Sequence, residues 1–165
     1  PDEGSDCEIT YFRPTIERVL RMLSTTADMA YVTLSADIRE DASILILEDD
    51  LYQIIFNLAE NGIKYNVPDG TLTVRLRREE DNAVLTISDT GMGIPTESLG
   101  RIFDRFYRVD KARSRQTGGS GLGLAIVKEM VERNRGSITV TSSDVPPTGT
   151  TFTLTFPVFD VEEEL

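Results

Sequence analysis

Hydrophobic residues recur every three or four positions in several segments of the chain, a spacing that predicts amphipathic helices. The expected helices cover residues 14–27, 49–65 and 122–134, with a shorter one at 99–106. Two of them begin with a typical start signal. Pro14 suits a first helical turn, and Asp49 and Asp50 lie where the helix dipole favours negative charge.

Other segments alternate between apolar and polar residues, which predicts strands. The expected strands cover residues 8–13, 31–35, 43–47, 71–77, 83–89, 137–142 and 150–157. The turn residues Val67–Gly70 lead into the strands at 71–77 and 83–89, which are expected to form a hairpin. Three long helices and several mostly antiparallel strands indicate an α/β (α+β) fold, a two-layer sandwich rather than a doubly wound sheet.

Length and composition narrow the class of protein. The chain has 165 residues, 39% hydrophobic and 27% charged, as expected for one globular domain. We expect residues 1–8 to be a flexible tail, residues 9–158 the domain, and residues 159–165 an acidic tail. The net charge of −11 argues against binding to nucleic acid or to anionic lipid surfaces. The chain has no histidine, which excludes histidine catalysis, histidine-ligated zinc and phosphohistidine on this chain.

The helix expected at residues 49–65 divides into an apolar and a polar arc. The apolar arc contains Leu51, Ile54, Ile55, Leu58 and Gly62, and the polar arc contains Gln53, Asn57, Asn61 and Lys64. Amide oxygens can hold a hard cation such as Mg²⁺, and a lysine can meet phosphate oxygens. A solvated polar face is the alternative interpretation, and Tyr65 could serve either the core or base stacking.

Asp89 is in line with the core-facing residues Leu85 and Ile87 of its strand. A carboxylate there is costly without a partner, and an exocyclic amine such as that of adenine would satisfy it. Gly91 and Gly93 follow and allow a planar ligand to approach the backbone. A turn-capping aspartate before glycine is the alternative.

The stretch from residue 90 to 120 is long for a loop inside a compact domain, and such loops are usually functional. Six basic residues between Arg101 and Arg115, against Asp104 and Asp110, give it a net charge of about +4. The glycine-rich segment 118–124 then opens a helix, where free N–H groups can bind an anion. We expect a lid over an anionic ligand, with a merely solvated loop as the alternative.

Taken together, these segments resemble the catalytic ATP-binding domain of bacterial sensor histidine kinases. Asn57–Tyr65 (NLAENGIKY) resembles the N box, Asp89–Pro95 (DTGMGIP) the first glycine box, and Ile102–Asp110 (IFDRFYRVD) the F box. Gly119–Leu124 (GSGLGL) resembles the second glycine box, and Gly149–Phe152 (GTTF) the terminal glycine motif. The resemblance implies a mixed, mostly antiparallel sheet covered on one face by three helices, with a long ATP lid. Gly62 departs from the alanine that is usual in the family.

The resemblance also implies roles for individual residues. Asn61 would be the principal Mg²⁺ ligand, with Asn57 contributing; Asn61, Lys64 and Arg108 would act in catalysis. ATP would be bound by residues from all five motifs: Asn57, Asn61, Lys64, Tyr65, Asp89, Gly91, Gly93, Ile94, Phe103, Arg108, Gly119, Gly121, Leu122, Gly123 and Thr151. Within this set, Asp89 would bind the adenine amino group and Arg108 would reach the γ-phosphate.

The reaction that the resemblance implies is transfer of the γ-phosphoryl group of Mg-ATP to a histidine on a separate dimerisation domain of the same receptor. A response regulator would act downstream. The hydrolytic relatives of the wider superfamily use a glutamate where this chain has Asn57, an amide that cannot take a proton from water. A nucleotide-binding regulatory module without transfer activity is the alternative. We expect a cytoplasmic domain of a membrane-anchored bacterial receptor, with no direct membrane contact of its own.

Overall fold

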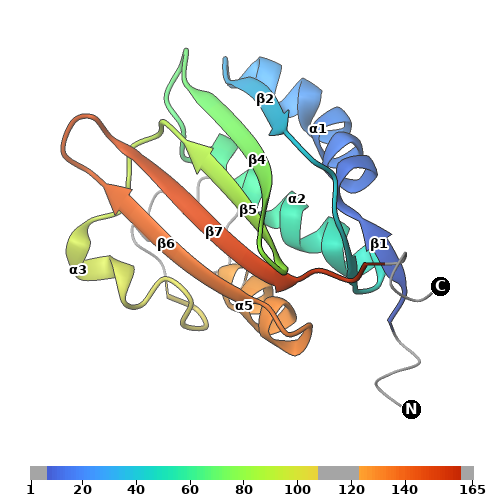
Figure 1. The fold of residues 1–165 in the computed structure, drawn as a ribbon. Coiled ribbons are helices and arrows are strands. Elements are labelled where there is room, and N and C mark those ends of the chain that lie inside the picture. Colours follow the sequence, from blue (N-terminus) through green and yellow to red (C-terminus); the bar gives the residue numbers. More distant parts are fainter. Residues whose placement is uncertain (1–6, 108–122, 161–165) are drawn as a thin grey trace.

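A five-stranded sheet is the centre of the fold in the computed structural model, which describes residues 7–107 and 123–160 (Figure 1). Its strands are β2 (Thr33–Ile38), β4 (Thr71–Glu79), β5 (Asn82–Asp89), β6 (Ser137–Ser143) and β7 (Gly149–Pro157). They lie in the order β2-β4-β5-β7-β6. Only the β2–β4 pair is parallel, and the other three pairs are antiparallel. The sheet is therefore mixed and mostly antiparallel, as predicted.

Three helices cover one face of this sheet, and no described helix lies on the other face (Figure 1). They are α1 (Phe12–Met29), α2 (Glu48–Lys64) and α5 (Gly123–Arg133). Inward-facing residues of the central strands alternate with outward ones, so Leu72, Val74 and Leu76 of β4 are fully or almost fully buried. The apolar arc of α2 packs on them, and Leu51, Ile54, Ile55, Leu58 and Gly62 are all buried as expected. The two-layer architecture follows from these two periodicities.

A second, two-stranded sheet joins β1 (Ile9–Tyr11) to β3 (Ser43–Leu45). The segment after β7 fastens it to the rest of the molecule. Phe159 donates its backbone N–H to the Ser43 carbonyl (2.8 Å), and the Ser43 hydroxyl donates to the Phe159 carbonyl (2.8 Å). Asp160 then forms a two-point ion pair with Arg78 of β4, at 2.7 and 2.9 Å. Residues 159 and 160, expected in a solvated acidic tail, are therefore bonded into the fold.

The helix predicted at residues 99–106 is wrong in extent. The structure has only α3 (Thr96–Leu99), followed by successive turns to Tyr107. Gly100 weakens helix continuation, and Phe106 adopts a positive φ of 65° that ends any regular helix. Tertiary packing also intervenes, because Ile102 is buried and Phe103 contacts Phe152 with ring centroids 6.2 Å apart.

The strand predicted at residues 31–35 is displaced to Thr33–Ile38. Residues 31 and 32 instead form the C-terminal cap of α1. Tyr31 adopts a φ of 59°, and the Val32 N–H donates back to the Ala27 carbonyl at 2.9 Å.

Among the described residues, no helix has both the length and the apolar character to cross a membrane.

Candidate functional site

The polar arc of α2 carries the amides that the sequence singled out. Asn57 and Asn61 are partly exposed, four residues apart on one side of the helix. Asn57 Oδ1 accepts a hydrogen bond from Gln53 Nε2 at 3.1 Å. The Asn61 side chain makes no hydrogen bond within the described residues. Its amide oxygen is therefore available to an external group.

Lys64 ends the same arc, at the C-terminal end of α2. Its Nζ lies 3.8 Å from Glu60 Oε1, one turn earlier. This surface ion pair is long and exposed, so it contributes little stability and is easily exchanged for another anion. Lys64 therefore lies on the same side of α2 as Asn61, and its ammonium group has no buried ion-pair partner among the described residues.

Asp89, at the end of β5, lies beneath the second half of α2. An added Cβ on Gly62 would lie 3.4 Å from Asp89 Oδ2 and 2.6 Å from Leu72 Cδ1. An alanine would thus meet the carboxylate at an ordinary contact distance, and its one close contact would be with the end of the flexible Leu72 side chain. Gly62, which departs from the family pattern, lies where α2 contacts the Asp89 side chain, but this contact does not require glycine.

The charge of Asp89 is not neutralised by a cation within the described residues. Gly91 donates its N–H to Asp89 Oδ1 at 2.8 Å. Burial raises the pKa of this carboxyl to about 6, and the backbone N–H groups of Gly91 and Thr150 oppose that rise. Asp89 is therefore a partly buried acceptor that an external donor could satisfy.

The loop after Asp89 is packed between α2 and β6. Gly91 lies against the end of α2, where an added Cβ would be 2.5 Å from the Tyr65 carbonyl oxygen, and Met92 donates its N–H to that oxygen at 3.2 Å. Gly93 has a φ of 78°, and an added Cβ there would overlap the Ser143 carbonyl oxygen. Both positions require glycine because the loop backbone lies so close to the neighbouring backbone. The loop lies at the end of the sheet where β5 and β6 finish (Figure 1).

The strand register separates two neighbouring threonines of β7. Thr150 is paired with Asp89, so its side chain lies on the helix-covered face, and it is buried. Thr151 lies on the opposite face, where its hydroxyl contacts the Ser88 hydroxyl at 2.7 Å. The expected nucleotide residue Thr151 is therefore not brought together with Asp89, whereas Thr150 is. Strand parity could have found Thr150, because Phe152, Leu154 and Phe156 also point inward.

The remaining expected residues fall into two groups. Tyr65, Ile94 and Phe103 are partly buried beside the loop and the core; Lys128 Nζ lies 5.5 Å from the centre of the Phe103 ring. Gly123 is exposed at the start of α5. Arg108, Gly119, Gly121 and Leu122 lie outside the described residues. Of the six basic residues expected in the lid, Arg101 pairs with Asp104 at 3.4 Å and Arg105 with Glu129 at 3.2 Å.

The donor chemistry of the site fits a cation held by amide oxygens. Within residues 7–107 and 123–160, no three side chains of Asp, Glu, Cys or His are grouped in a way that could bind a metal. Asn57 and Asn61 offer neutral oxygens instead. Mg²⁺ typically takes few protein ligands and completes its shell with water and substrate phosphates, so two amides are a sufficient protein contribution.

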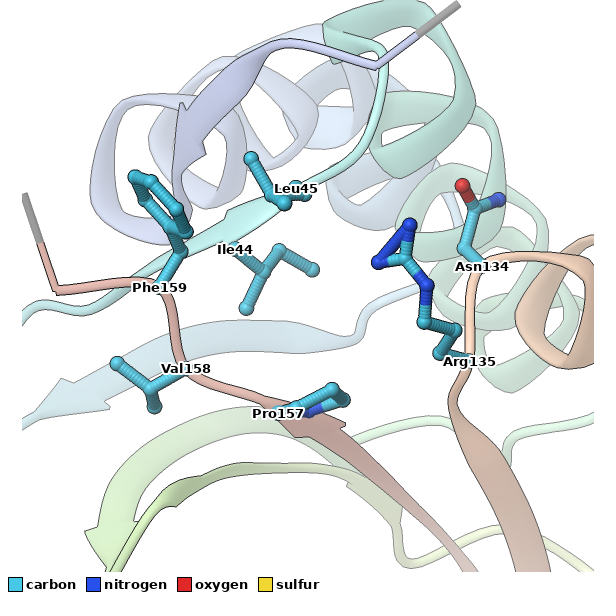
Figure 2. A pocket seen from close by; sticks show the side chains of 7 residues that line it. All are labelled: Ile44, Leu45, Asn134, Arg135, Pro157, Val158 and Phe159. Atoms are coloured by element: carbon cyan, nitrogen blue, oxygen red, sulfur yellow. The ribbon is translucent and has the colours of Figure 1, made fainter. Parts of the chain in front are cut away.

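A pocket elsewhere in the molecule is too small to be the expected nucleotide site (Figure 2). It has a volume of about 80 Å³, whereas pockets for drug-sized ligands measure roughly 300–1,000 Å³. It is lined by Ile44, Leu45, Asn134, Arg135, Pro157, Val158 and Phe159. None of these residues belongs to the five motifs, and Figure 2 places them between β3, the segment after β7 and the end of α5.

Comparison with known proteins identifies the class to which this fold and site belong. Residues 46–160 match the family described as histidine kinase-, DNA gyrase B- and HSP90-like ATPases. The chain therefore belongs to this ATPase family.

Within that family the chain is similar to sensor histidine kinases. It is 40% identical over 133 residues to the sensor histidine kinase RppB of Synechocystis, covering 80% of this chain and 29% of RppB. The mycobacterial sensor histidine kinase MprB has a similar structure, with a TM-score of 0.80, 28% identity, and coverage of 92% of this chain and 97% of that structure.

A further structure supports the fold alone. The histidine kinase ThkA in complex with the response regulator TrrA matches with a TM-score of 0.74 at 19% identity, covering 93% of this chain and 42% of that chain. The chain spans between 20% and 34% of the length of the first curated relatives it matches, so it corresponds to one part of such proteins.

Proposed function

We propose that this chain is the catalytic domain of a sensor histidine kinase, which binds Mg-ATP and transfers its γ-phosphoryl group to a histidine on a separate dimerisation domain. The observation that carries the proposal is Asp89, a partly buried carboxylate without a cationic partner in the described part of the chain. It lies under the helix that bears Asn57 and Asn61. One acceptor for a base and one set of cation ligands are thus on neighbouring elements.

Adenine recognition would rest on the acceptor-only character of ionised Asp89. Its carboxylate would accept a hydrogen bond from the exocyclic amine of adenine, which guanine and hypoxanthine lack at the corresponding position. Gly91 and Gly93 pack closely against the end of α2 and against β6, and so fix the loop beside which the base would lie. Tyr65 and Ile94 would border it.

Phosphate binding would rest on the polar arc of α2 and on the basic residues that follow the F box. Asn61 and Asn57 would hold Mg²⁺ through their amide oxygens. When bound, Mg²⁺ supplies charge neutralisation for the phosphate groups. Lys64 would exchange its exposed contact with Glu60 for a phosphate oxygen, and Arg108 would reach the γ-phosphate.

Transfer is favoured over hydrolysis because the described site lacks a base for water. Asn57 Oδ1 already accepts from Gln53, and an amide does not take up a proton at neutral pH. Glu60 lies about 100° around the helix from Asn61 and so does not face the phosphate region. The chain also contains no histidine, so the acceptor must be on another domain.

The relatives are named sensor histidine kinases, which supports two proposed partners. One is the histidine-containing dimerisation domain of the same receptor. The other is a response regulator, as in the complex of the structurally similar ThkA with TrrA. We propose a cytoplasmic position for the domain within a membrane-anchored receptor.

Calorimetric titration of ATP with and without Mg²⁺ tests the binding half of the proposal. We expect Asn61→Ala to remove most of the Mg²⁺-dependent part of the ATP affinity, a loss of roughly tenfold or more, because one charge-assisted ligand is lost. Asn82→Ala makes the same chemical change at the exposed start of β5 and serves as the control. Equal Mg²⁺ dependence in Asn61→Ala and the wild type would contradict the metal assignment.

Incubation with γ-labelled ATP tests the transfer half. We expect no acid-labile phosphate on the chain alone, and label on an added dimerisation domain at a rate proportional to its concentration. If ATP binds but the acceptor is never labelled, the chain is a regulatory nucleotide-binding module. If phosphate is released without an acceptor, the chain is a hydrolase.

A further inference from the structure

Ser142, near the end of β6, lies outside the five motifs, yet its hydroxyl joins three parts of the site. The Ile94 N–H donates to Ser142 Oγ at 2.8 Å. Ser142 Oγ also lies 2.9 Å from the Gly149 carbonyl oxygen and 2.8 Å from Thr150 Oγ1. It therefore connects the glycine loop, the start of β7 and the threonine that shares a face with Asp89.

The direction of each hydrogen bond follows from counting protons. A serine hydroxyl has one proton to donate and two lone pairs to accept with. The Gly149 carbonyl can only accept, so it takes the Ser142 proton. Ser142 then accepts from the Ile94 N–H, and its contact with Thr150 requires the Thr150 hydroxyl to be the donor. The Ser142 hydroxyl is thereby fully used.

This arrangement fixes the polarity of Thr150. Its only proton points at Ser142, so the side of the hydroxyl that remains free presents lone pairs alone. Thr150 is paired with Asp89 across β5 and β7, so both side chains lie on the helix-covered face. The Asp89 carboxylate and the Thr150 hydroxyl can therefore accept hydrogen bonds from a ligand but cannot donate any.

We propose that Ser142 is a positioning residue for base recognition, which holds the Ile94 loop in place and orients the Thr150 hydroxyl as an acceptor. The proposal rests on the proposed nucleotide site and deepens it. It explains how the site would favour a base with an amino group over one with a carbonyl group, because the side chains of Asp89 and Thr150 offer no donor to a carbonyl oxygen.

The test compares ATP with inosine triphosphate, which carries a carbonyl in place of the amino group. We expect the wild type to prefer ATP, and Ser142→Ala to lower the ratio of the two affinities by roughly threefold to tenfold, the effect of about one hydrogen bond. Without Ser142, the Thr150 hydroxyl is free to turn and donate to the carbonyl. Amide hydrogen exchange at Ile94 should also be faster in the ligand-free variant.

Two further variants keep the test specific. Ser142→Thr retains a hydroxyl and should restore the preference. Ser88→Ala removes a hydroxyl from the neighbouring β5–β7 pair on the face away from the helices and should leave the preference and the Ile94 exchange unchanged.

Each outcome has a distinct meaning. If Ser142→Ala weakens both nucleotides by the same factor, or leaves Ile94 exchange unchanged, Ser142 is not a positioning residue for the base. If the wild type binds neither nucleotide, the proposed function fails, while the exchange at Ile94 still decides whether Ser142 holds the loop.

Discussion

Asp89 costs the ligand-free domain stability at neutral pH. Its pKa rises from 3.8 to about 6 on folding, so the folded state favours the protonated form. The folded state therefore binds more protons than the unfolded state between these values, and stability falls as the pH rises through this range. This pKa shift corresponds to a loss of at most about 3 kcal/mol in the free energy of unfolding. The actual loss is smaller because the carboxyl is only partly buried. A charge kept at such a cost is typical of a binding site.

Replacing Asp89 by Asn should therefore separate stability from binding. The amide can still accept from the Gly91 N–H, while the buried charge is gone. We expect Asp89→Asn to raise the Tm by several degrees at pH 7.5 and to weaken ATP binding by roughly tenfold to a hundredfold. Thermal unfolding and calorimetric titration measure the two effects.

The pH dependence provides the control for this variant. The gain in Tm should shrink as the pH falls from about 6 towards 4 and should vanish well below 3.8, where the wild-type carboxyl is protonated in both states. ATP binding by the wild type should weaken relative to Asp89→Asn over the same interval, a comparison that cancels the titration of the ATP phosphates. A Tm gain that is independent of pH would show that the charge is not its cause.

The sequence was informative about single residues wherever a period could be counted. The period of two placed Asp89 on the core face, and the structure confirms its partial burial. The same counting, applied to β7, would have selected Thr150 instead of Thr151. Ser142 gave no signal, because its importance arises from contacts with residues 48 and 8 positions away in the chain.

At the scale of elements, the loop from Gly91 to Ile94 joins α2 to β6. It is bonded to α2 through Met92 and the Tyr65 carbonyl, and to β6 through Ile94 and Ser142. We expect Gly93→Ala to break this junction, because φ is 78° and the new Cβ would overlap the Ser143 carbonyl oxygen. The Tm should fall by roughly 5 °C and ATP affinity should be largely lost.

Gly100→Ala is the matched control, because nothing lies within 4 Å of an added Cβ and its φ is −73°. This variant should be neutral or slightly stabilising. If both variants lower the Tm equally, the positive φ of Gly93 and its close contact with Ser143 are not the cause of the destabilisation.

The helices and strands were predicted correctly where the local spacing of apolar residues determines their bounds. They were predicted poorly where contacts with distant segments determine them. α2 was found with its buried and polar arcs because both repeat at helical spacing over the 17 residues of the helix. The segment at residues 99–106 satisfied the same pattern, but Phe103 packs on Phe152, a contact with a distant strand. The parallel pairing of β2 with β4 is also invisible to local patterns, since it depends on α2 crossing between them.

At the scale of the whole molecule, the segment after β7 connects the two sheets. Its last described residue, Asp160, pairs with Arg78, and this guanidinium lowers the pKa of the Asp160 carboxyl. The pair therefore stabilises the fold above the unfolded pKa of about 3.9 and ceases to do so as the pH falls through the folded value. We expect Asp160→Asn to lower the Tm slightly at pH 7 and to have no effect once the carboxyl is protonated.

Glu79→Gln breaks another ion pair of β4, with Arg77 at 2.8 Å, that does not bridge two parts of the fold. It should change the Tm less than Asp160→Asn does, because an exposed pair within one strand restrains nothing else. If the two variants lower the Tm equally at pH 7, the segment after β7 does not hold the sheets together.

One part of the expected nucleotide site is already assembled in the ligand-free domain. The part around Asp89 consists of strand ends and a helix end that are bonded to one another without any ligand. A small heterocycle with an amine beside a ring nitrogen would therefore lose mainly its own freedom on binding, because the loop from Gly91 to Ile94 is already bonded to α2 and β6. Fragments of this kind should bind with high affinity per atom.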